Sequence, residues 1–169
     1  MSKVKQKIEL TANVLIIVVA VLLIGILAQK YFFSSSSNIP PPKTPAIGNK
    51  ISLADVDWSK SNQNVLLVLR KGCRYCSESA EFYKNLIQQT QGKNVNIIAV
   101  LPQNKVEAEE YLKSLGIAGI EIRQSQLDAL EVGGTPTIII VNDNGEIANF
   151  WLGKLLPEKE VEVVNQLTS

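Results

Sequence analysis

The chain has 169 residues, a formal net charge of +1 and no histidine. This length suffices for one domain with an appendage, and the near-neutral charge gives no reason to expect a nucleic-acid partner. The absence of histidine excludes catalysis by serine–histidine or cysteine–histidine pairs and any metal site that needs an imidazole ligand.

An uncharged, strongly apolar run lies near the N-terminus. It extends from Leu10 to Gln29, and its centre reads VLIIVVAVLLIGILA. A helix of about 20 residues spans the ~30 Å hydrocarbon core of a bilayer. No small-x-small cleavage site follows this run, so we predict an uncleaved transmembrane anchor (a signal anchor) over residues 10–33. A cleaved signal peptide is the alternative.

The residues around the apolar run predict its orientation. Three lysines lie in the short tail of residues 1–9, which we expect in the cytoplasm. The aromatic residues Tyr31–Phe33 suit the opposite membrane interface. The rest of the chain is therefore predicted to lie outside the cytoplasm, on the periplasmic or extracellular side of the cell membrane.

A Ser/Pro-rich segment, SSSSNIPPPKTPAIG, follows at residues 34–48. Serine makes a linker flexible, whereas a proline run favours extended polyproline II. We predict a linker here and a folded domain over residues 49–169.

The first half of this domain alternates strands and helices. A continuous apolar run predicts a buried strand at Asn64–Arg70, followed by a helix at Ser77–Gln91. A second strand is predicted at Asn94–Pro102. A capping box at Asn104 then opens a helix that ends at Gly116.

The second half predicts a hairpin and a terminal helix. A short strand at 120–122 and a short helix at 125–131 precede the strongest strand, Thr137–Val141, which turns into a partner strand at 146–153. Pro157 suits the first turn of a last helix. The inward face of that helix is expected to hold three side chains, those of Val161, Val164 and Leu167. The whole order predicts an α/β domain with a mixed central sheet flanked by helices.

The only two cysteines, Cys73 and Cys76, lie where the first strand meets its helix. Backbone N–H groups and the dipole at a helix N-terminus stabilise a thiolate on Cys73, and Arg70, Lys71 and Arg74 add positive charge nearby. Cys76, one turn into the helix, is placed to attack a mixed disulfide. We therefore predict redox exchange, with Cys73 as the nucleophile and Cys76 as the resolving residue.

Three alternatives compete with redox exchange. Zinc normally needs four ligands, and two cysteines without histidine supply only half of them, so no metal or other cofactor is predicted. A structural disulfide that closes so short a loop gains little chain entropy. The pair could also be two unrelated free thiols.

A second motif, GGTPT at Gly133–Thr137, lies just before the strongest strand. With the CxxC pair, the following NG hairpin and Gly153 ahead of the last helix, it makes the chain resemble the thioredoxin superfamily over Gly48 to Ser169. The layout is most similar to the membrane-tethered, extracytoplasmic branch related to the TlpA and ResA proteins.

The resemblance implies a thioredoxin-like fold in which the peptide bond before Pro136 is cis. It also implies that the backbone of Thr135 lies beside Cys73 and pairs with an extended client segment, as in strand addition. Together with Arg74 and Tyr75, between the cysteines, Thr135 and Pro136 are the expected substrate-binding residues.

The chain departs from thioredoxin at several positions. Gly72 stands in place of a Trp before the first cysteine, and Arg74–Tyr75 replaces Gly-Pro. Leu67 stands in place of the buried Asp that is thought to help deprotonate the second cysteine. Glu78 and Glu81 are candidate substitutes, although such residues more commonly favour a helix N-terminus and face solvent.

The predicted function is that of a membrane-anchored thiol–disulfide oxidoreductase acting on extracytoplasmic proteins. Reductase action is weakly favoured, because the strongly oxidising members of the superfamily have a histidine after the first cysteine. The expected partners are proteins with disulfides or thiols and an upstream redox partner, such as a membrane electron donor. The alternatives are a tethered binding or chaperone module without redox turnover, and a peroxiredoxin-like peroxidase, which would need Thr or Ser where Arg70 stands.

Overall fold

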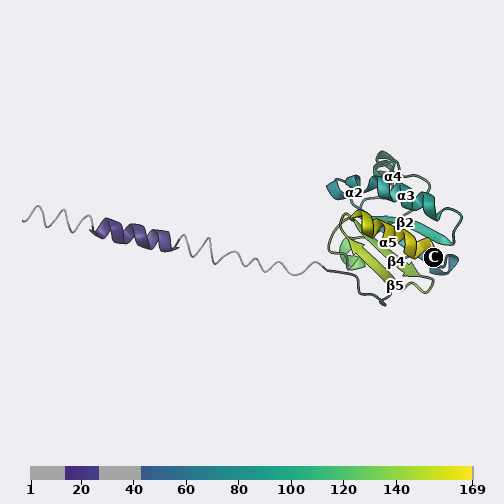
Figure 1. Cartoon of the computed structure of the whole chain (residues 1–169), viewed down its shortest axis with the longest axis horizontal. Coiled ribbons are helices and arrows are strands. Elements are labelled where there is room, and N and C mark those ends of the chain that lie inside the picture. Colours follow the sequence, from purple (N-terminus) through teal and green to yellow (C-terminus); the bar gives the residue numbers. More distant parts are fainter. Residues whose placement is uncertain (1–13, 27–42, 169) are drawn as a thin grey trace, which may run out of the picture. The chain divides into compact units, whose positions relative to one another are not determined.

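The computed structural model describes residues 14–26 and 43–168 of the chain (Figure 1). Residues 14–26 form a helix with exposed side chains. Within the described ranges, no helix is both long enough and apolar enough to cross a bilayer. The predicted basic tail, both ends of the predicted anchor and most of the predicted linker lie outside the described residues.

The domain at residues 43–168 is built on a five-stranded sheet with the strand order β3-β2-β1-β4-β5. The strands β1 and β2, and likewise β2 and β3, pair in parallel, whereas β4 is antiparallel to both β1 and β5. The predicted mixed sheet is therefore confirmed. The bounds of the strands are β1 Gln63–Val68, β2 Val95–Leu101, β3 Glu121–Gln124, β4 Thr137–Asn142 and β5 Ile147–Leu152.

Helices cover this sheet mainly on one face. The crossovers from β1 to β2 and from β2 to β3 run in the same direction, and right-handed connections then put their helices on the same side. The helix α3 also packs beside α5 (Figure 1). The bounds are η2 Trp58–Lys60, α2 Arg74–Glu78, α3 Ala80–Thr90, α4 Lys105–Ser114, η3 Leu127–Leu130 and α5 Pro157–Thr168.

Alternate side chains of β1 pack into two separate apolar cores, because successive side chains of a strand point to opposite faces of the sheet. Leu67 belongs to the core beneath the helices, which also contains both cysteines. Leu66 belongs to the core on the other face, which Ile51 and Leu130 help to close. Because β1 is buried on both faces, it reads as a continuous apolar run and forms a fixed platform for the loop that follows it.

The single helix expected at Ser77–Gln91 is two helices, which is a correction to the sequence analysis. The chain is already helical from Arg74, and the regular helix is interrupted at Ser79, where φ is −93° and ψ is 2°. Apolar periodicity missed the first helix because Arg74–Glu78 buries only Cys76. The first helix therefore begins directly at the cysteine pair.

The inward face of α5 also differs from the expectation. Val161 is 57% exposed, whereas Val163 is fully buried. Val163 and Leu167 are four residues apart and share one side of the helix. That side enters the core that holds the cysteines, so the prediction for Val161 is wrong.

Candidate functional site

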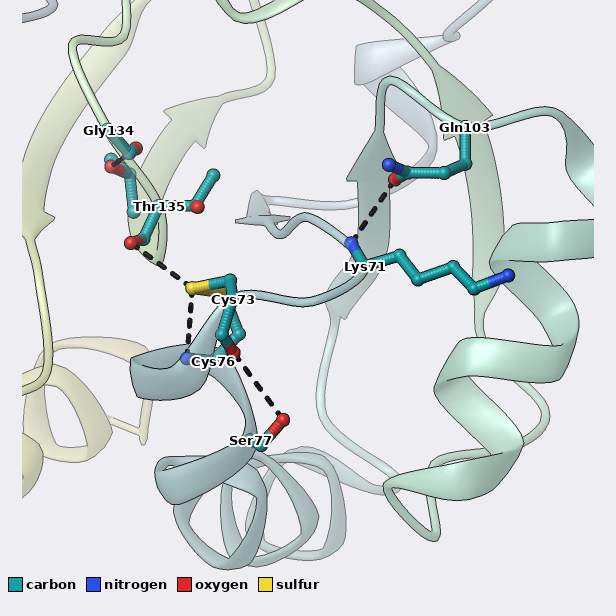
Figure 2. The surroundings of a disulfide bond; sticks show 8 residues. Lys71, Cys73, Cys76, Ser77, Gln103, Gly134 and Thr135 are labelled. Atoms are coloured by element: carbon teal, nitrogen blue, oxygen red, sulfur yellow. Dashed lines mark hydrogen bonds between the residues drawn. A yellow bond between two sulfur atoms is a disulfide. The ribbon is translucent and has the colours of Figure 1, made fainter.

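Cys73 and Cys76 form a disulfide at the start of α2 (Figure 2). Cys73 is the N-cap residue of this helix, and its Sγ atom accepts the backbone N–H of Cys76 at 3.2 Å. Gly72, just before, has a φ of +80°, a left-handed conformation that glycine adopts without steric cost. The turn after β1 thus places Cys73 at the N-terminus of α2. A helix N–H that donates to the sulfur is the geometry expected to favour a thiolate.

The two cysteines differ in their access to solvent. Cys73 is 7% exposed, whereas Cys76 is fully buried. Both belong to the apolar core under the helices. Cys73 is therefore the more accessible residue of the pair, and the roles predicted for the two cysteines stay predictions.

The Thr135–Pro136 peptide bond is cis. The carbonyl oxygen of Thr135 lies 3.4 Å from the Sγ atom of Cys73 (Figure 2). In the disulfide this is a contact without a proton, whereas in the dithiol the Cys73 S–H group can donate to that oxygen. The structure thus brings Thr135 and Pro136 to the side of Cys73, as the resemblance implied.

Two hydrogen bonds hold the turn that contains Pro136. The carbonyl oxygen of Pro136 accepts the backbone N–H of Gly153 at 2.7 Å. The hydroxyl of Thr137 donates to the carbonyl oxygen of Gly134 at 2.8 Å. The loop after β5 is therefore fastened to the turn that faces the cysteines.

Two of the three basic residues near Cys73 in the chain, Lys71 and Arg74, are engaged by carboxylates. The Nζ atom of Lys71 lies 3.6 Å from Glu107 on α4, and its side chain extends away from the sulfur atoms (Figure 2). Arg74 donates from Nε to Glu78 at 2.7 Å. Their fields at Cys73 are therefore partly cancelled, whereas the backbone N–H of Cys76 at the start of α2 donates directly to the Cys73 Sγ atom.

Tyr75 lies at the exposed surface of α2. It is 54% exposed and lies next to Cys76 in the chain. Both residues between the cysteines, Arg74 and Tyr75, are therefore exposed to solvent.

Glu78 connects two elements at this site. Its second carboxylate oxygen accepts from Nζ of Lys154, in the loop after β5, at 2.9 Å. Hydrogen bonds from Lys154 and then Arg74 hold the pKa of Glu78 below its ordinary value. An anion so stabilised is a poor proton carrier near neutral pH, which argues against Glu78 as the replacement for the missing Asp.

The other positions that bear on proton transfer are equally unsuited to it. Glu81 pairs with Lys84 at 2.6 Å on the outer side of α3. Leu67 is fully buried in the same core as the cysteines.

Across residues 14–26 and 43–168, no group of three or more Cys, Asp or Glu side chains could hold a metal ion.

No pattern in the sequence predicts that Lys154 belongs to this site. Glu78 and Arg74 are four residues apart, a spacing that predicts an ion pair along a helix. Lys154 is 76 residues from Glu78 in the chain, and no local pattern links them.

Solved structures of low sequence identity share this architecture. The thioredoxin domain of a thiol-disulfide oxidoreductase from Bacteroides vulgatus matches with a TM-score of 0.61 and 14% identity, covering 75% of this chain and 100% of that one. StoA from Bacillus subtilis matches with a TM-score of 0.54 and 16% identity, covering 76% of this chain and 100% of that one.

A thiol-disulfide isomerase from Corynebacterium glutamicum matches with a TM-score of 0.55 and 13% identity, covering 78% of this chain and 98% of that one. No protein-family profile and no curated protein sequence matches the chain. At these identities the likeness establishes the fold, so the predicted thioredoxin-like fold is confirmed.

Proposed function

We propose that the chain is a membrane-anchored thiol–disulfide oxidoreductase that acts on protein disulfides outside the cytoplasm. The observation that carries this proposal is the position of Cys73, whose Sγ atom accepts a helix N-terminal N–H and lies 3.4 Å from the carbonyl oxygen of Thr135. The printed names of the similar structures, among them an oxidoreductase and an isomerase of thiols and disulfides, support the same chemistry.

The reductive reaction proceeds in two exchanges. The Cys73 thiolate attacks one sulfur of the client disulfide, a mixed disulfide forms, and the other client sulfur leaves as a thiolate that takes a proton from water. Cys76 then loses its proton and attacks the Cys73 sulfur. The Cys73–Cys76 disulfide forms, and the client leaves with two thiols. Two electrons have passed to the client, and an upstream donor must restore the dithiol.

A client needs a binding edge as well as a reactive sulfur. The turn at Thr135 and Pro136 offers a backbone beside Cys73 with which an extended segment can pair. Arg74 and Tyr75 lie on the exposed surface of α2. We assign substrate binding to these residues and catalysis to Cys73 and Cys76, and we favour reduction over oxidation as the direction.

Membrane attachment is part of the proposal. The apolar run from Leu10 to Gln29 and the exposed apolar helix at residues 14–26 support an anchor at residues 10–33. The linker at 34–48 would hold the domain at 49–169 away from the bilayer, on the extracytoplasmic side. Flotation with liposomes tests the anchor: the full chain should float, and a chain that lacks residues 1–33 should stay in the dense fraction.

Reduction of insulin disulfides tests the chemistry. The full chain in a non-ionic detergent, supplied with dithiothreitol, should accelerate insulin precipitation, and Cys73→Ser should lower the rate to that of dithiothreitol alone. Undiminished activity in Cys73→Ser would reject Cys73 as the nucleophile. A wild-type chain that binds unfolded proteins but gives no acceleration would favour a binding module without redox turnover.

A further inference from the structure

Two cations from separate elements bind one carboxylate, that of Glu78 at the end of α2, the short helix that Cys73 caps. Arg74 donates from Nε to Glu78 at 2.7 Å, and Lys154 donates from Nζ to its other oxygen at 2.9 Å. Arg74 directly follows Cys73 in the chain. Lys154 directly follows Gly153, whose N–H binds the carbonyl oxygen of Pro136. The ion pairs of Glu78 therefore join α2, which begins directly after Cys73, to the loop that is hydrogen-bonded to the turn at Pro136.

These cations remain open to a further anion. The side chain of Arg74 is 83% exposed, and that of Lys154 is 45% exposed. Glu78 engages the guanidinium through Nε, so a carboxylate from solvent can approach the two terminal nitrogens. Those nitrogens form a planar fork that matches a carboxylate in a two-pronged contact. Because Glu78 already orders Arg74, little side-chain freedom is lost when a second anion binds.

The charge balance around Cys73 also favours an anionic client. Glu78 is paired with two cations, Arg74 and Lys154. Glu107 on α4 is paired with Lys71. Arg70 is a further exposed base at the end of β1. Among these side chains the four bases outnumber the two carboxylates, and an excess of positive charge attracts acidic segments and repels basic ones.

We propose that Arg74 and Lys154 select clients in which an acidic side chain neighbours the reactive cysteine. This inference rests on the proposed function and names its substrate class. Arg74 and Lys154 act as specificity residues: they bind the client carboxylate and take no part in the transfer of electrons. Tyr75 and Leu152, which are 54% and 40% exposed, offer apolar contact to the rest of the segment.

Three synthetic peptides test the preference. Each has the same internal disulfide and differs only beside one cysteine, where it carries Glu, Gln or Lys. The reduced full chain, in non-ionic detergent at low salt, reacts with each peptide, and every rate is divided by the rate of the same peptide with dithiothreitol. This division removes the effect of the neighbouring charge on the disulfide itself.

The Glu peptide should react about fivefold faster than the Gln peptide, the order expected for a good exposed ion pair, and the Lys peptide should be slowest. The preference should shrink as salt rises, because exposed charges are screened. In the double variant Arg74→Gln/Lys154→Gln the three normalised rates should converge.

A matched control removes the same charge elsewhere. Lys84 on α3 pairs with Glu81 and lies beside Gly116, just past the end of α4. Lys113 is exposed in the last turn of α4. The variant Lys84→Gln/Lys113→Gln should keep the Glu preference. Equal normalised rates for all peptides with the wild-type chain would overturn the inference and leave the proposed function standing. Failure to reduce any peptide would instead reject the proposed function.

Discussion

Cys73 and Thr135 are 62 residues apart in the chain, yet the Sγ atom of one lies 3.4 Å from the carbonyl oxygen of the other. This relationship follows from the sheet. Strands β1 and β4 are antiparallel neighbours, and Val68 at the end of β1 is in register with Thr137 at the start of β4. The turn after β1 and the turn before β4 therefore meet at one edge of the sheet.

The different burial of the two cysteines predicts that Cys76→Ser traps a client on Cys73. Cys76 is fully buried behind Cys73, so its thiol can reach the Cys73 sulfur while a client cannot reach Cys76. Without that thiol the mixed disulfide has no internal route to resolution. Non-reducing gels should show a covalent complex with Cys76→Ser and none with Cys73→Ser. A complex that forms equally well with Cys73→Ser would reverse the assigned roles.

Glu78→Gln is predicted to make the protein a stronger oxidant. The substitution removes the negative charge that neutralises Arg74 and Lys154, so these cations act more strongly on the Cys73 thiolate. The reduced form is stabilised, and the equilibrium with glutathione should move about twofold to fivefold toward the dithiol, the range expected for exposed charges.

The pH dependence and a control give this prediction its test. Because hydrogen bonds from Lys154 and Arg74 hold the pKa of Glu78 below its ordinary value, its carboxylate is ionised at neutral pH and loses its charge only in acid. The difference between wild type and Glu78→Gln should persist near pH 7. Glu81→Gln, which alters a carboxylate paired on the outer side of α3, should leave the equilibrium unchanged. A shift of the same size in Glu81→Gln would contradict a local effect.

Alkaline stability should depend on Tyr83. Burial raises the pKa of this phenol in the folded protein, whereas in the unfolded chain it ionises near pH 10. Above about pH 10 the unfolded state releases a proton that the folded state keeps. The free energy of unfolding should therefore fall with pH by up to about 1.4 kcal/mol per unit from this residue alone. Below that pH the contribution is fully present.

Tyr83→Phe isolates this effect, because phenylalanine keeps the ring and loses the ionisable hydroxyl. Urea unfolding at pH 7 and at pH 11 should give a smaller difference in stability for Tyr83→Phe than for wild type. Tyr75→Phe is the matched control, since Tyr75 is 54% exposed, and it should behave as wild type. Identical pH dependence in wild type and Tyr83→Phe would exclude Tyr83 as the source.

The meeting of Cys73, Cys76 and Pro136 was predictable from the sequence because these residues belong to two strong local motifs. Cys73 and Cys76 are the only cysteines, and Pro136 stands before the most apolar strand at the spacing typical of one superfamily. The alternation of strands and helices then fixed the mixed sheet. Both motifs follow or precede central strands, so their meeting at one edge is a consequence of topology.

Other features of the structure depend on tertiary contacts, which produce no periodic pattern in the sequence. The helix is interrupted at Ser79, and α5 buries Val163 and exposes Val161, which depends on the side of α5 that meets the core. The contact of Lys154 with Glu78 joins a loop to a helix from distant parts of the chain. Hydrophobic patterning predicts which residues face the core. The partner of a charged side chain such as Lys154 depends on how the elements pack, which the pattern does not contain.

Two glycines with similar backbone angles should respond very differently to alanine. Gly145, in the turn between β4 and β5, has a φ of +81°, and a Cβ atom there would lie 2.8 Å from Cδ1 of Trp58. Gly119 has a φ of +75°, and a Cβ atom there would meet nothing within 4 Å. Gly119→Ala should therefore lower the free energy of unfolding by only about 1 kcal/mol, the cost of a positive φ for alanine.

Gly145→Ala should cost more, by about 1–3 kcal/mol, because the indole of Trp58 must also move within the core that closes the far face of the sheet. Urea unfolding of both variants measures the difference. Insulin reduction by the folded fraction should be unchanged, since Gly145 lies at the end of β4 opposite to the end that carries Pro136. Equal losses of stability in the two variants would show that the contact with Trp58 adds nothing to the backbone term.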